Sequence, residues 1–115
     1  MDLNRVTLIG NLTKDPAKKA SPSGQSISEF SLATNYRTEA KETVEFHDIV
    51  AWGKLADIIS QYVKKGSKVY VEGRLHTNGW KDKAGKPHKK TEIVADNLIM
   101  LGHRGKKEVQ VPASA

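Results

Sequence analysis

The chain has 115 residues, no cysteine and a formal net charge of +6, and its sequence pI is about 9.6. This length predicts one domain whose core needs no disulfide or metal, and the lack of cysteine excludes disulfides and thiolate metal sites. The basic balance favours a polyanionic partner, although a lysine-rich surface also serves solubility alone. Without a membrane-length apolar run or a signal-peptide pattern, we expect a cytoplasmic protein that binds no membrane.

The first half of the chain predicts three strands separated by polar loops. Apolar residues alternate with polar ones over residues 4–12, 27–36 and 44–52, as in strands with one buried face. Residues 13–26 contain two prolines, a glycine, serines and lysines, which is a turn composition. Residues 37–43 are polar and predict a second loop.

A helical period appears once, directly after the third strand. Residues 54–64 repeat apolar side chains at helical spacing, with Tyr62 assigned to the core, and Gly66 follows as a helix stop. Alternation returns over residues 68–77, whose expected inward positions are Val69, Val71, Gly73 and Leu75. The pair Asn78-Gly79 then signals a tight turn or a bulge.

The end of the chain completes the pattern. Residues 81–90 predict a charged loop, residues 91–101 a fifth strand, and residues 103–115 a flexible basic tail after a domain of residues 1–102. Three strands, a helix and two strands match the OB fold, an all-β class. We therefore expect a five-stranded antiparallel Greek-key barrel, with one α-helix between strands three and four. Such barrels bind oligonucleotides or oligosaccharides on one face.

The segment "EFHDIVAWGK" raises the question of which face of the third strand is buried. On one face lie Phe46, Asp48, Val50 and Trp52. Small apolar Ile49 and Ala51 lie on the other, and alternation alone allows either face to be the core. If Ile49 and Ala51 fill the barrel, Phe46 and Trp52 point outward and need a cover, which a stacked base would provide.

The charged loop favours the outward orientation of the rings. It begins directly after Trp80 and carries one aspartate against five lysines, Lys81, Lys83, Lys86, Lys89 and Lys90. Lysines that follow phosphates beside rings that stack on bases are typical of a single-strand groove, although many such loops are only solvated hairpin tips. Tyr36 could extend this path, and charge and position suggest three further phosphate contacts, Arg5, Lys54 and Arg74.

Several segments together resemble one family, among them "NRVTLIGNLTKDP", "EFHDIVAWGKLAD" and "YVKKGSKVYVEGRLHT". In residues 2–102 the chain resembles the bacterial single-stranded DNA-binding proteins. The resemblance implies an OB fold, a homotetramer, and sequence-independent coating of single-stranded DNA in replication, recombination and repair. It places Phe46, Trp52 and Trp80 at base-stacking positions, Tyr36 near another, and His47 at a subunit interface.

The ending departs from that family, whose members typically continue into a Gly/Pro/Gln-rich linker and an acidic tip that recruits replication proteins. This chain ends in the basic "KKEVQVPASA", so the resemblance does not extend to recruiting replication and repair proteins.

No enzyme is expected, because His47 and Asp48 point to opposite faces and the four histidines lack metal spacing. No cofactor or metal is expected either. The alternatives are an OB-fold replication-restart accessory, an RNA-binding protein, and a protein-interaction module.

Overall fold

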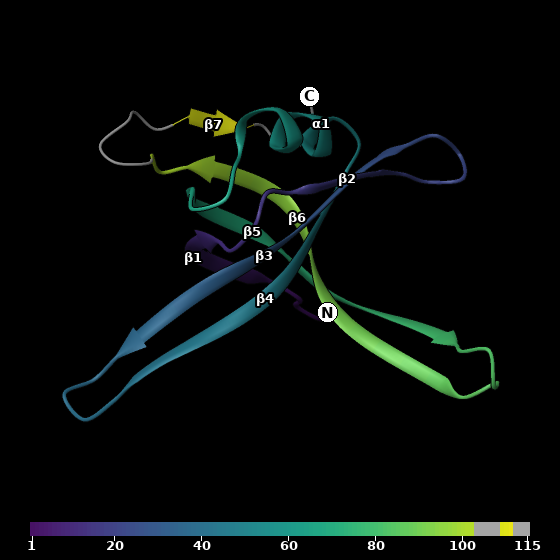
Figure 1. Cartoon of the computed structure of the whole chain (residues 1–115), viewed down its shortest axis with the longest axis horizontal. Helices are drawn as coiled ribbons and strands as arrows, with labels where there is room; N and C mark the ends of the chain where they lie inside the picture. The colour runs from purple at the N-terminus through teal and green to yellow at the C-terminus, as the bar shows by residue number, and fades with distance from the viewer. Residues whose placement is uncertain (103–108, 112–115) are drawn as a thin grey trace.

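A closed five-stranded barrel forms the body of this computed structural model, which describes residues 1–102 and 109–111 (Figure 1). Its strands are β1 (Val6–Leu12), β3 (Ser26–Arg37), β4 (Glu42–Trp52), β5 (Lys68–Lys81) and β6 (Pro87–Met100). They follow the order β1-β5-β6-β4-β3, and a β1–β3 pairing closes the ring. The helix α1 (Gly53–Tyr62) connects β4 to β5, so the expected OB-type barrel with one helix is confirmed.

The sequence pattern suggested that all strand pairings around the barrel are antiparallel. One of those in the described part of the chain is parallel. Within the described residues, β4 and β6 pair in parallel over two positions, Ile49 with Ile93 and Val50 with Val94. The other neighbouring pairs in the ring are antiparallel. The parallel contact is the point where the two long hairpins, β3–β4 and β5–β6, meet before they diverge.

Two short strands lie outside this ring. β2 (Ala17–Ala20) pairs with β3 inside the segment expected to be a turn, and all four of its residues are exposed. With no buried face, this strand has no apolar alternation to reveal it. β7 (Val109–Val111) pairs with β6 in the expected tail, while residues 103–108 and 112–115 of that tail lie outside the described residues.

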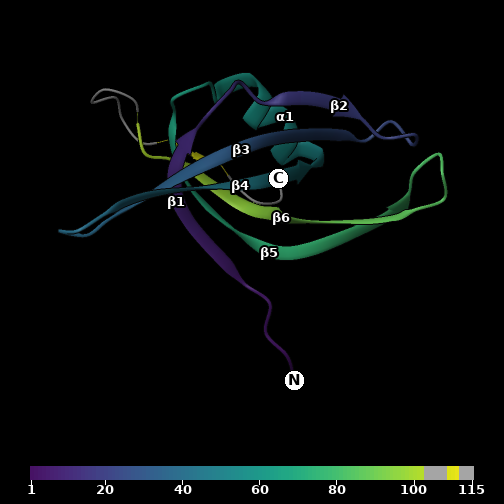
Figure 2. The same ribbon diagram turned by 60° about the horizontal axis from the view of Figure 1, so that its bottom comes forward.

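The β5–β6 hairpin is longer than expected, and its turn lies elsewhere. Asn78 and Gly79 pair in register with Lys90 and Lys89 inside the ladder, so the expectation of a tight turn or a bulge at Asn78-Gly79 is wrong. The chain reverses at 82–86, where the Asp82 carboxylate accepts backbone N–H groups of Ala84 and Lys86, both at 2.9 Å. The two hairpins project from the barrel in opposite directions (Figures 1 and 2).

The barrel core is apolar and agrees with most of the expected inward positions. Phe30, Ile49, Val69 and Val71 are buried in it. Tyr62 was assigned to the core but is 53% exposed, because the last turn of α1 extends beyond the packed stripe of Leu55, Ala56 and Ile59. Leu75 was expected inward but is 50% exposed, since β5 has left the closed barrel by this point.

Strand β5 bends at Gly73, where the β5–β6 register shifts between Glu72 and Gly73. A Cβ at Gly73 would overlap the backbone carbonyl of Val94, so β5 and β6 approach too closely for any side chain there. We expect Gly73→Ala to lower the free energy of unfolding by about 1–3 kcal/mol through this overlap.

Denaturant unfolding followed by circular dichroism measures the effect. Gly79→Ala is the matched control on the same strand, because its added Cβ would lie 3.8 Å from the nearest atom, the carbonyl oxygen of His88. The control should remain within about 1 kcal/mol of the wild type. Equal stability of the Gly73→Ala variant would contradict the close approach of β5 and β6.

Candidate nucleic-acid interface

The structure resolves which face of β4 is buried. Ile49 and Ala51 are 1% and 0% exposed and belong to the core, whereas Phe46 and Trp52 are 68% and 43% exposed. The prediction that both rings point out of the barrel is therefore confirmed. Val50 was expected to point outward with the two rings, but it is buried, because Val94 of β6 lies beside it in the parallel pairing.

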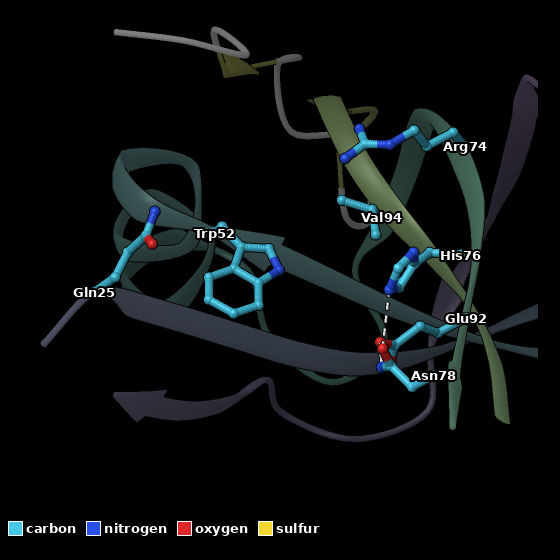
Figure 3. Close-up of a pocket in the computed structure, with 7 residues that line it drawn as sticks. All are labelled: Gln25, Trp52, Arg74, His76, Asn78, Glu92 and Val94. Atoms are coloured by element: carbon cyan, nitrogen blue, oxygen red, sulfur yellow. Dashed lines mark hydrogen bonds between the residues drawn. The ribbon is translucent and has the colours of Figure 1, made fainter. Parts of the chain in front are cut away.

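Trp52 forms one wall of a surface hollow of about 300 Å³, which we call the Trp52 hollow (Figure 3). The other lining residues come mainly from β5 and β6, and they are Gln25, Arg74, His76, Asn78, Glu92 and Val94. The Trp52 indole faces polar and charged side chains, so the hollow can hold a nucleotide. The base would stack on the indole, and the polar side chains would meet the edges of the base. Sequence reasoning did not identify Gln25, Asn78 or Glu92.

The polar side of the Trp52 hollow is a connected chain of hydrogen bonds. The Nε2 atom of His76 lies 2.9 Å from Oδ1 of Asn78, and the Asn78 amide donates to Glu92 at 2.5 Å (Figure 3). Since these side chains extend from paired positions of β5 and β6, the ladder itself aligns them. The hollow is therefore largely preformed, which lowers the ordering cost of binding.

Phe46 borders a second hollow, of about 190 Å³, where the two hairpins diverge. Its lining, which defines the Phe46 hollow, is Phe46, His47, Asp48, Leu75, Thr91, Glu92 and Ile93. Glu92 is shared with the Trp52 hollow, so the two hollows adjoin. The two exposed rings of β4 thus belong to one continuous surface of the barrel.

Trp80 lies farther out on β5 and is 49% exposed. Its ring stacks on His88 of β6, with ring centroids 5.6 Å apart and an angle of 20° between the planes. Nε2 of His88 lies 2.8 Å from Oδ2 of Asp82, and this hydrogen bond, with the backbone bond from Lys86, lowers the pKa of Asp82. The Asp82–His88 contact thereby links the hairpin tip to the ring that stacks on Trp80.

The candidate cations divide into paired and unpaired groups. Arg5 pairs with Glu72 at 2.8 Å, Arg74 with Asp96 at 2.9 Å, and Lys90 with Asp48 at 3.7 Å. Among the side chains that the structure describes, five candidates form no ion pair and are exposed, namely Lys54, Lys81, Lys83, Lys86 and Lys89. These five are free to meet phosphates, whereas phosphate would have to replace a carboxylate at the other three.

Tyr36 lies away from this surface, whereas His47 lines the Phe46 hollow. Tyr36 is 69% exposed near the end of the β3–β4 hairpin, whereas Trp80 belongs to β5. These two hairpins project from the barrel in opposite directions (Figure 2). His47 is partly exposed, and its Nε2 lies 2.9 Å from the Thr34 hydroxyl of the neighbouring strand. The structure therefore groups Phe46, Trp52 and Trp80 along one side, without bringing Tyr36 to them.

Comparison with known proteins settles the family. The model of the single-strand binding protein family matches residues 3–101. The chain belongs to this family. This family is defined by binding, which supports the expectation that the chain is not an enzyme. No helix in the described part of the chain is long and apolar enough to cross a membrane.

Individual relatives agree with the family model. Single-stranded DNA-binding protein 1 of Chlorobaculum tepidum is 51% identical over 106 residues, which are 87% of this chain and 65% of that protein. This chain thus spans just under two thirds of the length of that curated relative. A solved Plasmodium falciparum SSB complex with ssDNA superposes with a TM-score of 0.78 at 37% identity, covering 89% of this chain and 97% of that one. The fold and the family resemblance are both confirmed.

Proposed function

We propose that this chain binds single-stranded DNA without sequence specificity, and protects and organises it during replication, recombination and repair in the cytoplasm. One observation carries the proposal: Phe46 and Trp52 are exposed on the outer face of β4, beside a hairpin that carries Trp80 and unpaired lysines. The structural similarity to a family member in complex with ssDNA supports it.

In the proposed binding mode, aromatic rings bind the bases and cationic side chains bind the phosphates. Bases stack on Trp52, Phe46 and Trp80, each stack contributing roughly 1–3 kcal/mol whatever the base. Phosphates follow the lysines of the β5–β6 hairpin and release counterions. Arg5 and Arg74 can contact phosphates only if each gives up its carboxylate partner, Glu72 or Asp96. This exchange costs little free energy, because exposed ion pairs contribute about 0–1 kcal/mol.

The test is the salt dependence of binding to oligo-dT, with oligo-U in parallel. The logarithm of the affinity should fall against the logarithm of salt concentration with a slope of about −0.7 per phosphate neutralised. Tighter binding to oligo-U would favour the RNA-binding alternative. No binding to either at low salt would contradict the proposal and favour an interaction module whose aromatic face is covered by protein.

We also infer that the chain assembles as a homotetramer, with His47 at a subunit contact. Besides the family resemblance, the support is exposed apolar surface along the N-terminal edge, where Leu3 and Ile9 are 88% and 51% exposed. Over Val6–Gly10, strand β1 pairs with β5 alone among the described strands, so its other edge is open.

Light scattering measures the assembly directly. We expect a mass of about four times the 12.7 kDa of one chain. A mass of one chain would contradict the tetramer, and a mass of two chains would favour the replication-restart accessory alternative.

A further inference from the structure

Asp48 lies where a surface that binds a polyanion would not be expected to carry a negative charge. Strand alternation places it on the outer face of β4 between Phe46 and Trp52, and it also lines the Phe46 hollow. Its side chain is 55% exposed. Since a carboxylate repels phosphates, the sugar–phosphate backbone should avoid this position.

The carboxylate of Asp48 is free to accept hydrogen bonds. Its nearest charged partner in the described chain is Nζ of Lys90, at 3.7 Å, which is too long for a hydrogen bond and is an exposed contact of small energy. Glu92, the other carboxylate of the Phe46 hollow, already accepts the Asn78 amide. His47 is likewise engaged by Thr34. Asp48 is therefore the unsatisfied acceptor of this hollow.

What reaches Asp48 should be the edge of a base. If bases stack on Phe46 and Trp52, the ring edges lie over the residue between them, and phosphates lie toward the lysines of the hairpin. An ionised carboxylate can only accept hydrogen bonds. The exocyclic amino group of cytosine donates to it, whereas thymine presents a carbonyl oxygen at the same ring position.

We propose that Asp48 gives the surface a base preference, by accepting a hydrogen bond from the exocyclic amino group of cytosine that thymine cannot supply. The inference rests on the proposed binding of single-stranded DNA and adds a modest preference to a groove that otherwise tolerates any sequence. Preferences of such grooves usually arise from stacking and backbone flexibility. Cytosine and thymine are both single-ring bases, so comparing them largely isolates the hydrogen bond.

The experiment measures affinities for oligo-dC and oligo-dT of about 16 nucleotides, near the upper span of one barrel, at neutral pH. The variant is Asp48→Asn, which keeps the side-chain size but places donor and acceptor atoms together. We expect it to lower the ratio of dC affinity to dT affinity about three- to tenfold, the value of one ordinary hydrogen bond, because Asp48 is exposed to water and the asparagine oxygen can still accept. The affinity for oligo-dT should rise because a negative charge is removed, and the affinity for oligo-dC should not rise as far because it also loses the ionised acceptor.

Two controls separate base readout from charge. Glu45→Gln removes the same charge from the opposite face of the same strand, where Glu45 is exposed and forms no ion pair with a described residue. Lys90→Gln removes the only ion-pair partner of Asp48 in the described chain. Neither control should change the dC to dT ratio, although Lys90→Gln should weaken binding to both.

The outcomes are distinct. An equal rise in both affinities for Asp48→Asn, or no change in either, overturns the inference while the proposed function stands. A drop of the ratio in Lys90→Gln as large as in Asp48→Asn overturns it also, because the ion pair would then be responsible. A wild-type protein that binds neither oligonucleotide overturns the proposed function, and this inference with it.

Discussion

Replacing Trp52 with alanine is expected to weaken binding to oligo-dT by roughly 1–3 kcal/mol and to leave the barrel folded. The side chain is 43% exposed and lies on the outer face of β4, while Ala51 and Ile49 of the same strand fill the core. Its removal therefore takes away a stacking surface and one wall of the Trp52 hollow, but no part of the hydrophobic core.

Tyr62→Ala is the matched control for that loss of an exposed ring. Tyr62 is 53% exposed at the end of α1 and does not line either hollow, so its replacement should leave the affinity unchanged. Titration calorimetry gives the affinities, and circular dichroism confirms the fold. Unchanged affinity of the Trp52→Ala variant would contradict the stacking role, and unfolding would contradict the orientation of the strand.

Neutralising the hairpin lysines should change the salt dependence more than any single substitution. The variant replaces four unpaired lysines with glutamine, namely Lys81, Lys83, Lys86 and Lys89. If each contacts one phosphate, the slope of log affinity against log salt should become shallower by about 3. Affinity at low salt should fall strongly, while stacking on the three rings should persist.

The control removes equal charge at the other end of β5. Lys64, Lys65 and Lys68 lie between the end of α1 and the start of β5, and Lys14 precedes Asp15, which accepts the Lys65 backbone N–H. These four lysines are exposed and form no ion pair with a described residue. Replacing these with glutamine lowers the net charge by the same amount but should leave the slope nearly unchanged. Equal slopes in the two variants would mean that overall charge, not the hairpin, attracts the DNA.

Local pattern was sufficient for the elements that have one buried face. Alternation predicted β1, β3 and β4, and the apolar period predicted α1. Alternation left both faces of β4 open, and the charged loop beside Trp80 favoured Ile49 and Ala51 as the inward face. Local pattern failed for β2, whose four residues are all exposed. The element order nevertheless specified the barrel, because few topologies accommodate a helix between the third and fourth of five strands.

Errors arose where long-range contacts override a local signal. The pair Asn78-Gly79 is a strong turn signal, yet Asn78 bonds to His76 and Glu92 within the ladder, and Asp82 organises the turn instead. Leu75 keeps its strand alternation but is exposed because β5 extends past the barrel. The Trp52 hollow joins Gln25 to Glu92, and no spacing in the sequence reveals such a juxtaposition.

The most direct test of the account is tryptophan fluorescence during titration with oligo-dT at low and high salt. The chain has two tryptophans, Trp52 and Trp80, and both lie on the proposed binding surface, so the signal reports on stacking itself. We expect strong quenching that saturates at low salt and weakens only partly at high salt, since stacking persists when phosphate contacts are screened. Absence of quenching at low salt would contradict the central claim that these rings stack on the bases of single-stranded DNA.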